Sequence, residues 1–219
     1  MTTSDFVALL LSAKLALLSC LILLPLVSPL AWWLSRRSNF KKQIILALSF
    51  LPLVLPPTVL GFYLLLLLGP AGPLQALGIH NLLFSFNGLL VASLIYSLPF
   101  ALQPLLSSFS LIDQHYLDAA RSLRASPWQL FSRVILPFSR RAYLLAGLLV
   151  FTHTLGEFGV VLMIGGNIPG ETQMVSVAIF EKVENLEYAS AHMMSVLLIV
   201  LSLGCLLLLQ RLNHGRTDI

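Results

Sequence analysis

The side chains that could do chemistry in this chain are few, and one pair has a spacing that could bring two of them together. His153 and Glu157 are four residues apart, so on a helix they would share a face. An enzyme acting inside a membrane needs a nucleophile with a base, or metal ligands, and this pair alone comes near. Cys20 and Cys205 lie in apolar runs near opposite ends of the chain. We expect them to be small buried hydrophobes.

Phosphate-binding chemistry is also missing from the sequence. There is no Gly-x-x-x-x-Gly-Lys-Ser/Thr segment, which is the loop that cradles the phosphates of a bound nucleotide. The histidines and cysteines show no spacing typical of a metal site. We therefore expect no catalytic residues, no metal and no cofactor in this chain.

The elements that position these side chains are strongly apolar. Hydrophobic residues make up 58% of the 219 residues and charged residues 10%, against about 45–50% and about 25% in soluble domains. This composition excludes an ordinary cytosolic enzyme, a disordered regulator and a nucleic-acid-binding domain. The net charge of +4 is spread between apolar segments and forms no basic stripe.

Gaps between charges predict membrane-spanning helices, each of which needs about 20 apolar residues. Residues 43–112 carry no charge and are interrupted by a Gly/Pro cluster at 69–73, so they are expected to hold two spans. We predict an all-α membrane protein with a single transmembrane domain over 1–219. The five predicted spans are about 6–34, 43–68, 86–110, 141–165 and 189–210. A sixth span or an interfacial helix is the alternative, and Glu157 interrupts the fourth span.

The signs of the charges predict the orientation. Eleven of the thirteen basic residues lie in 35–42, 111–141 and the C-terminal tail, which five spans would place on one side. The positive-inside rule assigns that side to the cytoplasm. The N-terminus is then outside and the C-terminus cytoplasmic. The start of the chain lacks a basic segment before the first span, so we expect no cleaved signal peptide.

The loop 111–140 is predicted to fold as a pair of helices. Residues 116–123 are a good helical stretch, and Ser126-Pro127 followed by Gln129 is a typical helix start. The second helix is expected to run to Leu136-Pro137. Such a pair must bury its apolar face against its own bundle or against a separate protein.

The same loop resembles the EAA loop of ABC-importer permeases. Asp118-Ala119-Ala120 and the segment 134–137 keep the family's spacing, with Asp118 in place of Glu. Arg124 stands where the family has Gly, a residue that reaches left-handed dihedral angles freely. Arg124 therefore implies either a less tight turn or a turn without a positive φ.

Three further segments resemble the molybdate branch of this family: 56–61, 155–159 and 165–173. The resemblance implies a type I ABC-importer permease fold and a homodimer in the bacterial inner membrane. It also implies two cytoplasmic ABC ATPase subunits, which bind the ATP and Mg, and a periplasmic molybdate-binding protein. The expected partners therefore include membrane lipid and no nucleic acid.

The family resemblance also points to candidate site residues. Those expected to couple to the ATPase are Asp118, Ala119, Ala120, Arg121, Leu123, Arg124, Ser126, Pro127 and Trp128. Asp118 would place a charge at the ATPase interface, or would simply stabilise the N-terminal part of its helix. Trp128 would be an anchor in a groove of the ATPase, or a tryptophan at the membrane interface.

Candidates for the pathway or its gate are Glu157, His153, Gly156, Gly159 and Asn167. An acid lining a path for a dianion would repel it, so we expect Glu157 to hold the 156–159 region by hydrogen bonds, with a gate as the alternative. His153 would pair with Glu157 or pack between helices. Residues 165–173 would form a turn at the outer face or contact the anion through backbone amides.

The sequence therefore predicts the permease subunit of an ATP-driven molybdate importer, without enzymatic activity of its own. Tungstate and sulfate are tetrahedral dianions of similar size and remain alternative cargoes. A stand-alone secondary anion transporter is the alternative from another class. It would be expected to show internal repeats, and none is evident.

Overall fold

The computed structural model describes residues 3–37, 39–70, 72–73, 78 and 82–214, which excludes Arg216 of the basic tail. Every regular element in this part of the chain is helical, as predicted. In chain order the helices are α1 (Thr3–Ser35), α2 (Phe40–Val54), α3 (Pro57–Leu68), α5 (Phe86–Tyr96), α6 (Leu98–Ser110), α7 (Gln114–Ser122), α8 (Pro127–Leu130), the π-helix η1 (Phe131–Ile135), α9 (Leu136–Gly156), α10 (Gly159–Gly165), α11 (Val175–Glu184) and α12 (Tyr188–His214).

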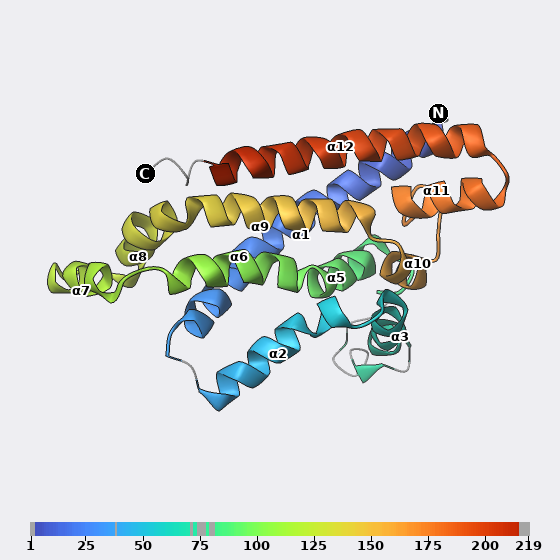
Figure 1. Ribbon diagram of the computed structural model, residues 1–219. Coiled ribbons are helices and arrows are strands. Elements are labelled where there is room, and N and C mark those ends of the chain that lie inside the picture. The colour runs from blue at the N-terminus through green and yellow to red at the C-terminus, as the bar shows by residue number, and fades with distance from the viewer. Residues whose placement is uncertain (1–2, 38, 71, 74–77, 79–81, 215–219) are drawn as a thin grey trace.

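The bundle is built around α1, α6 and α9, which pack against one another (Figure 1). Helix α12 lies along α9 and α11. Helices α7 and α8 lie at one end of the bundle, which we call the α7 end. Helices α10 and α11 and the N-terminus lie at the other, the α11 end (Figure 1). Helix α12 ends towards the α7 end, so the described ends of the chain lie at opposite ends of the bundle (Figure 1).

Three of the described helical segments are long and apolar enough to cross a membrane: Thr3–Ser35, Pro127–Gly156 and Tyr188–Leu208. Two bent pairs, α2 with α3 and α5 with α6, raise the number to five if each pair is one span. The bends are 113° and 40° respectively. The segment 43–68 is thus not one straight helix, because the chain leaves the helical path at Leu55 and restarts at Pro57.

The predicted fourth span, 141–165, also differs from the structure. Its helix begins well before residue 141, within the loop helix that starts at Pro127, and ends at Gly156. Glu157 and Phe158 then break the helix, and α10 is a separate element.

The buried apolar residues form two main clusters. The cluster nearer the α7 end joins the second half of α1 with α6, α7 and α9. The cluster nearer the α11 end joins α3, α5 and α10 around Leu15 of α1. Along α1, along α5–α6 and along α9–α10, buried polar residues separate one cluster from the other. This polar layer consists of Ser19, Ser93, Ser97, Thr154 and Glu157.

Candidate functional site: the coupling helix pair and the polar layer

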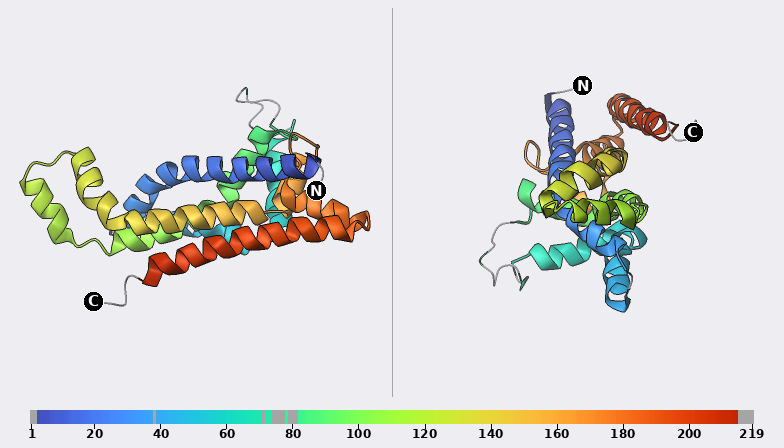
Figure 2. Two further views of the ribbon diagram at one scale, coloured as in Figure 1. Left: turned by 90° about the horizontal axis from the view of Figure 1, so that it is seen from above. Right: turned by 90° about the vertical axis from the view of Figure 1, so that its left-hand side faces the viewer.

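Helices α7 and α8 form a helix pair that stands out beyond the bundle at the α7 end (Figure 2). The Asp113 side chain caps α7 by accepting a hydrogen bond from the His115 amide. Ser126 and Gln129 form the capping box that starts α8, and Pro127 occupies its first turn, which confirms the predicted helix start. Leu117 is the buried residue of α7 and anchors it in the cluster near the α7 end.

The turn between the two helices is tight and uses a left-handed residue. Arg124 has φ of +55°, and the Ala125 amide donates to the Ala120 carbonyl at 3.0 Å. This hydrogen bond is the one that closes a helix C-terminus in the Schellman motif, in which glycine is usual at the left-handed position. The expectation of a looser turn, or of a turn without a positive φ, is therefore wrong. Arg124 takes the left-handed conformation at a cost of about 1–2 kcal/mol for an L-residue.

The outward face of the pair combines a charge with apolar side chains. Asp118 accepts from Arg121 at 3.0 Å and from Gln114 at 3.1 Å. Leu123 is 84% exposed and Trp128 is 72% exposed. The exposed side chains of Tyr116, Leu123 and Trp128 make up what we call the apolar tip. Helix α7 buries Leu117 against its own bundle, whereas the described chain leaves these three side chains uncovered.

The second helix does not end at Leu136-Pro137 as predicted. It continues through η1 into α9, and the Leu136 amide donates to the Phe131 carbonyl across the wider π turn. Proline cannot donate a backbone hydrogen bond and crowds the carbonyl four residues earlier. A π turn just before Pro137 relieves this conflict. The helix pair is thus joined without a break to the central helix α9.

Arg36, in the basic segment 35–42, contacts the bundle at the α7 end. Its Nη2 donates to the Phe109 carbonyl at 2.8 Å, and its guanidinium lies 4.0 Å from the ring centroid of Trp32. The last carbonyls of a helix lack partners within the helix, so Arg36 stabilises the end of α6 where the loop begins.

His153 and Glu157 do not pair with each other in the structure. His153 Nδ1 is 3.0 Å from Ser97 Oγ, and Ser93 Oγ donates to Glu157 Oε2 at 2.9 Å. Ser93 and Ser97, four residues apart on α5–α6, therefore contact Glu157 and His153, which are also four residues apart. The imidazole of His153 also stacks on Phe100 at a centroid distance of 4.1 Å.

The break after α9 is held by backbone contacts as well. The Glu157 carbonyl accepts from Ser176 Oγ at 2.5 Å. Gly159 faces Pro57, where an added Cβ would lie 3.0 Å from the Pro57 Cβ, so a side chain would push α10 away from α3. Gly156 is different, because a Cβ there would meet no atom within 4 Å.

Asn167 lies in a folded turn at the α11 end. It has φ of +56°, and its Nδ2 donates to Glu181 Oε2 at 3.1 Å. Gln173 Nε2 donates to the same oxygen at 2.7 Å. Thr172 Oγ1 closes the turn by donating to the Gly165 carbonyl at 2.6 Å. The candidate Asn167 thus positions its own loop on α11.

Helix α11 is attached to α1. Lys182 Nζ is 3.0 Å from Asp5 Oδ1 and 3.6 Å from Glu187 Oε2, and the hydrogen bond to Asp5 raises the pKa of Lys182. Ser12 Oγ of α1 accepts from the Val175 amide at 2.8 Å and so satisfies the first turn of α11. Val175 and Ala178 are buried in a cluster with Ala8 of α1 and Met194 of α12.

The comparisons with known proteins agree with this arrangement. The family model for the binding-protein-dependent transport system inner membrane component matches residues 27–217. The chain belongs to this family. The family description and the apolar helices together make it a multi-pass protein of the inner membrane.

Individual relatives carry more specific names. The molybdenum transport system permease protein ModB of Azotobacter vinelandii is 52% identical over 192 residues, which are 86% of this chain and 85% of that protein. The chloroplastic sulfate permease 2 of Chlamydomonas reinhardtii is 35% identical over 79% of this chain and 48% of that protein. A bacterial ABC transporter that imports the polysaccharide alginate shares the fold, with a TM-score of 0.76 over 100% of this chain and 82% of that chain, at 16% identity.

Proposed function

We propose that this chain is the transmembrane permease subunit of an ATP-driven importer that moves molybdate from a periplasmic binding protein into the cytoplasm. The observation that carries the proposal is the helix pair, which has the EAA spacing and presents a charge and an apolar tip away from the bundle. The names of the relatives support molybdate as the cargo. Sulfate is a second candidate because a sulfate permease is among the relatives.

In this proposal the α7 end is cytoplasmic. The helix pair binds a groove of a separate ATPase subunit, which supplies the ATP and Mg, while the permease chain holds no cofactor. Two copies of the chain and two ATPase subunits assemble, and the binding protein docks at the α11 end. The N-terminus is then outside and the C-terminus inside. The termini at opposite ends of the bundle support this orientation.

Coupling follows from how the helix pair is connected. Closure of the ATPase pair would move α7 and α8. The unbroken helix from α8 to α9 would carry that motion to the polar layer, where α9 ends. The contacts of Glu157 with Ser93 and Ser176 support a structural role at this break, in preference to a gate.

The proposal is tested on the complex reconstituted with its ATPase and binding-protein partners. We expect molybdate-loaded binding protein to stimulate both ATP hydrolysis and uptake, and Asp118→Lys to abolish uptake. Because the Asp118–Arg121 pair is exposed and worth about 0–1 kcal/mol, the variant should fold normally. Normal uptake by Asp118→Lys would refute the docking of this face. Uptake without any ATPase subunit would instead favour a secondary transporter.

A further inference from the structure

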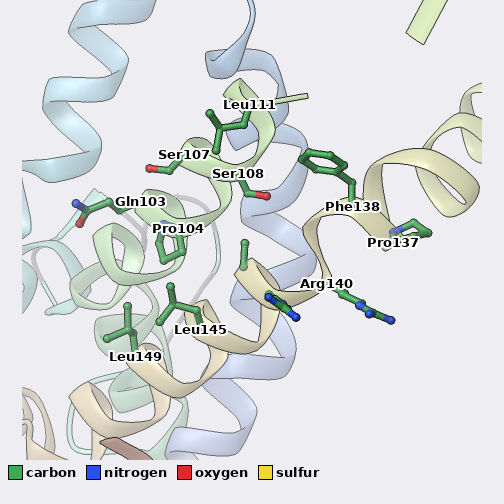
Figure 3. Close-up of a pocket in the computed structure, with 12 residues that line it drawn as sticks. Gln103, Pro104, Ser107, Ser108, Leu111, Pro137, Phe138, Arg140, Leu145 and Leu149 are labelled. Atoms are coloured by element: carbon green, nitrogen blue, oxygen red, sulfur yellow. The ribbon is translucent and has the colours of Figure 1, made fainter. Parts of the chain in front are cut away.

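A groove of about 670 Å³ opens between α6 and α9 near the α7 end (Figure 3). Gln103, Ser107 and Ser108 of α6 lie on one side, and Pro137, Phe138 and Arg140 of α9 lie on the other (Figure 3). Arg141 also lines the groove, and no acid is among its lining residues. The groove is separate from the helix pair and from the polar layer.

The α6 wall is unexpectedly polar for a membrane span. Gln103 and Ser107 are one helical turn apart in a segment without charges, and both are exposed. A primary amide facing hydrocarbon would lose its hydrogen bonds to water, which is costly. Polar side chains in spans therefore face protein or a water-filled cavity. The groove supplies such a cavity.

The α9 wall brings positive charge to the same space. Arginine stays protonated at any pH the protein meets, and its planar fork of N–H donors matches the oxygens of a tetrahedral oxyanion. Arg140 and Arg141 line the same groove as the hydroxyl and amide groups of α6, and their charge would attract a dianion into it. Because the groove is open, the attraction would be screened and brief, which suits a site that must release its ion.

We propose that this groove is the inner mouth of the anion pathway, in which Arg140 and Arg141 hold a tetrahedral dianion transiently with help from Gln103 and Ser107. The inference rests on the proposed function, because the groove can be the inner mouth only if the α7 end is cytoplasmic. It adds a site for the cargo that differs from the candidates Glu157, His153 and Asn167, all of which lie nearer the α11 end.

The test is cysteine labelling of the permease–ATPase complex in nanodiscs of neutral lipid, without ATP. Cys20 and Cys205 are first replaced by Ala. Ser107→Cys then places a thiol in the groove, and Leu144→Cys places one on an exposed neighbouring face of α9 that does not line the groove. Each is treated with an anionic and with a cationic methanethiosulfonate reagent of similar size.

We expect Ser107→Cys to react and Leu144→Cys to stay unreactive. At about 0.1 M salt the anionic reagent should react about threefold faster than the cationic one, which follows from two charges about one Debye length away. Millimolar molybdate should slow the reaction. Replacing Arg140 and Arg141 by Gln should remove the charge preference. Arg133→Gln, which removes a charge outside the groove, should preserve it.

Several results would overturn the proposal. Equal, slow labelling of both cysteines would mean that another chain or lipid fills the groove. Labelling of Ser107→Cys without charge preference or oxyanion protection would mean a wet groove with no anion site. Protection only in discs of anionic lipid would assign the arginines to lipid headgroups. Protection by sulfate but not molybdate would support the groove and refute molybdate as cargo, so the two proposals fail separately.

Discussion

Truncating Leu117 to Ala tests how the helix pair of α7 and α8 is held on the bundle. Leu117 is 1% exposed and packs in the cluster that contains Phe109, Ile112 and Ile135. No other residue of α7 is buried. The helix has nine residues, too few to be stable alone in water, so its structure depends on this one anchor.

The size of the effect follows from the burial. Removing a leucine side chain from a packed core costs about 2–5 kcal/mol, the lost burial together with the cavity that remains. This cost corresponds to a roughly 30- to 5,000-fold shift from docked to undocked α7. The rest of the bundle keeps its contacts, so the loss is expected to be local.

Hydrogen exchange of the complex in nanodiscs, read by mass spectrometry, measures this shift directly. We expect the amides of α7 in Leu117→Ala to exchange faster by about the same factor, while α1 and α9 exchange as in the wild type. Molybdate uptake should fall in parallel, because an undocked α7 cannot carry motion from the ATPase to the bundle.

Leu123→Ala is the matched control. It deletes the same atoms from the same loop, but Leu123 is exposed in the apolar tip. We expect its α7 amides to exchange normally while uptake falls, because in the proposed function the tip contacts the ATPase subunit and does not hold the fold together. Wild-type exchange in Leu117→Ala, or an equal loss of protection in Leu123→Ala, would refute the division of α7 into a buried anchor and an outward face.

Other variants test the remaining contacts. Arg124→Gly should leave the free energy of unfolding unchanged or raise it by up to about 1 kcal/mol, because glycine has no penalty at positive φ. Arg124→Val should lower it, and the melting temperature reports both changes. Since Asp5 raises the pKa of Lys182, this ion pair should stabilise the protein fully below the ordinary lysine pKa of about 10.4, and the stabilisation should disappear as pH rises through the raised pKa. The melting temperature of the wild type, measured from pH 9 to 12, should show this fall. The melting temperature of Lys182→Met should not. Glu157→Leu should cost about 1–3 kcal/mol by leaving Ser93 without its acceptor, and Glu157→Gln less, as measured by thermal unfolding in detergent.

Local signals in the sequence predicted the helix pair well, because they depend on few residues. The capping box at Ser126 acts within one helical turn, so it could be recognised without knowing the fold. Arg124 in the sequence predicted either a looser turn or a turn without a positive φ. Both expectations were wrong, because the hydrogen bond from Ala125 to Ala120 closes α7 tightly and Arg124 has φ of +55°. The residue type alone did not indicate this conformation.

Contacts between distant segments could not be predicted in the same way. The helical spacing of His153 and Glu157 allowed either a pair or a histidine packed between helices. In the structure each side chain meets a serine of α5–α6, more than fifty residues earlier. Glu157 was recognised as an interruption of the fourth span, but the sequence did not show that the helix ends at Gly156 and that α10 is a separate element. Gln103 could have been noticed in the sequence, because a primary amide is unusual in a span without charges. Its neighbours in the groove come from α9 and are visible only in the fold.

The polar layer between the two apolar clusters has a mechanical consequence. Sliding one apolar surface over another disturbs many closely fitted contacts at once, because protein interiors are packed like crystals. A hydroxyl can instead exchange one acceptor for another with little change in shape. The two halves of the bundle can therefore keep their own interiors rigid and shift against each other at the serines, with α1 as the continuous member that limits the travel. A leucine in place of Ser93 would remove this exchangeable contact, and it would also crowd a fully buried site and leave the Glu157 carboxylate without its donor.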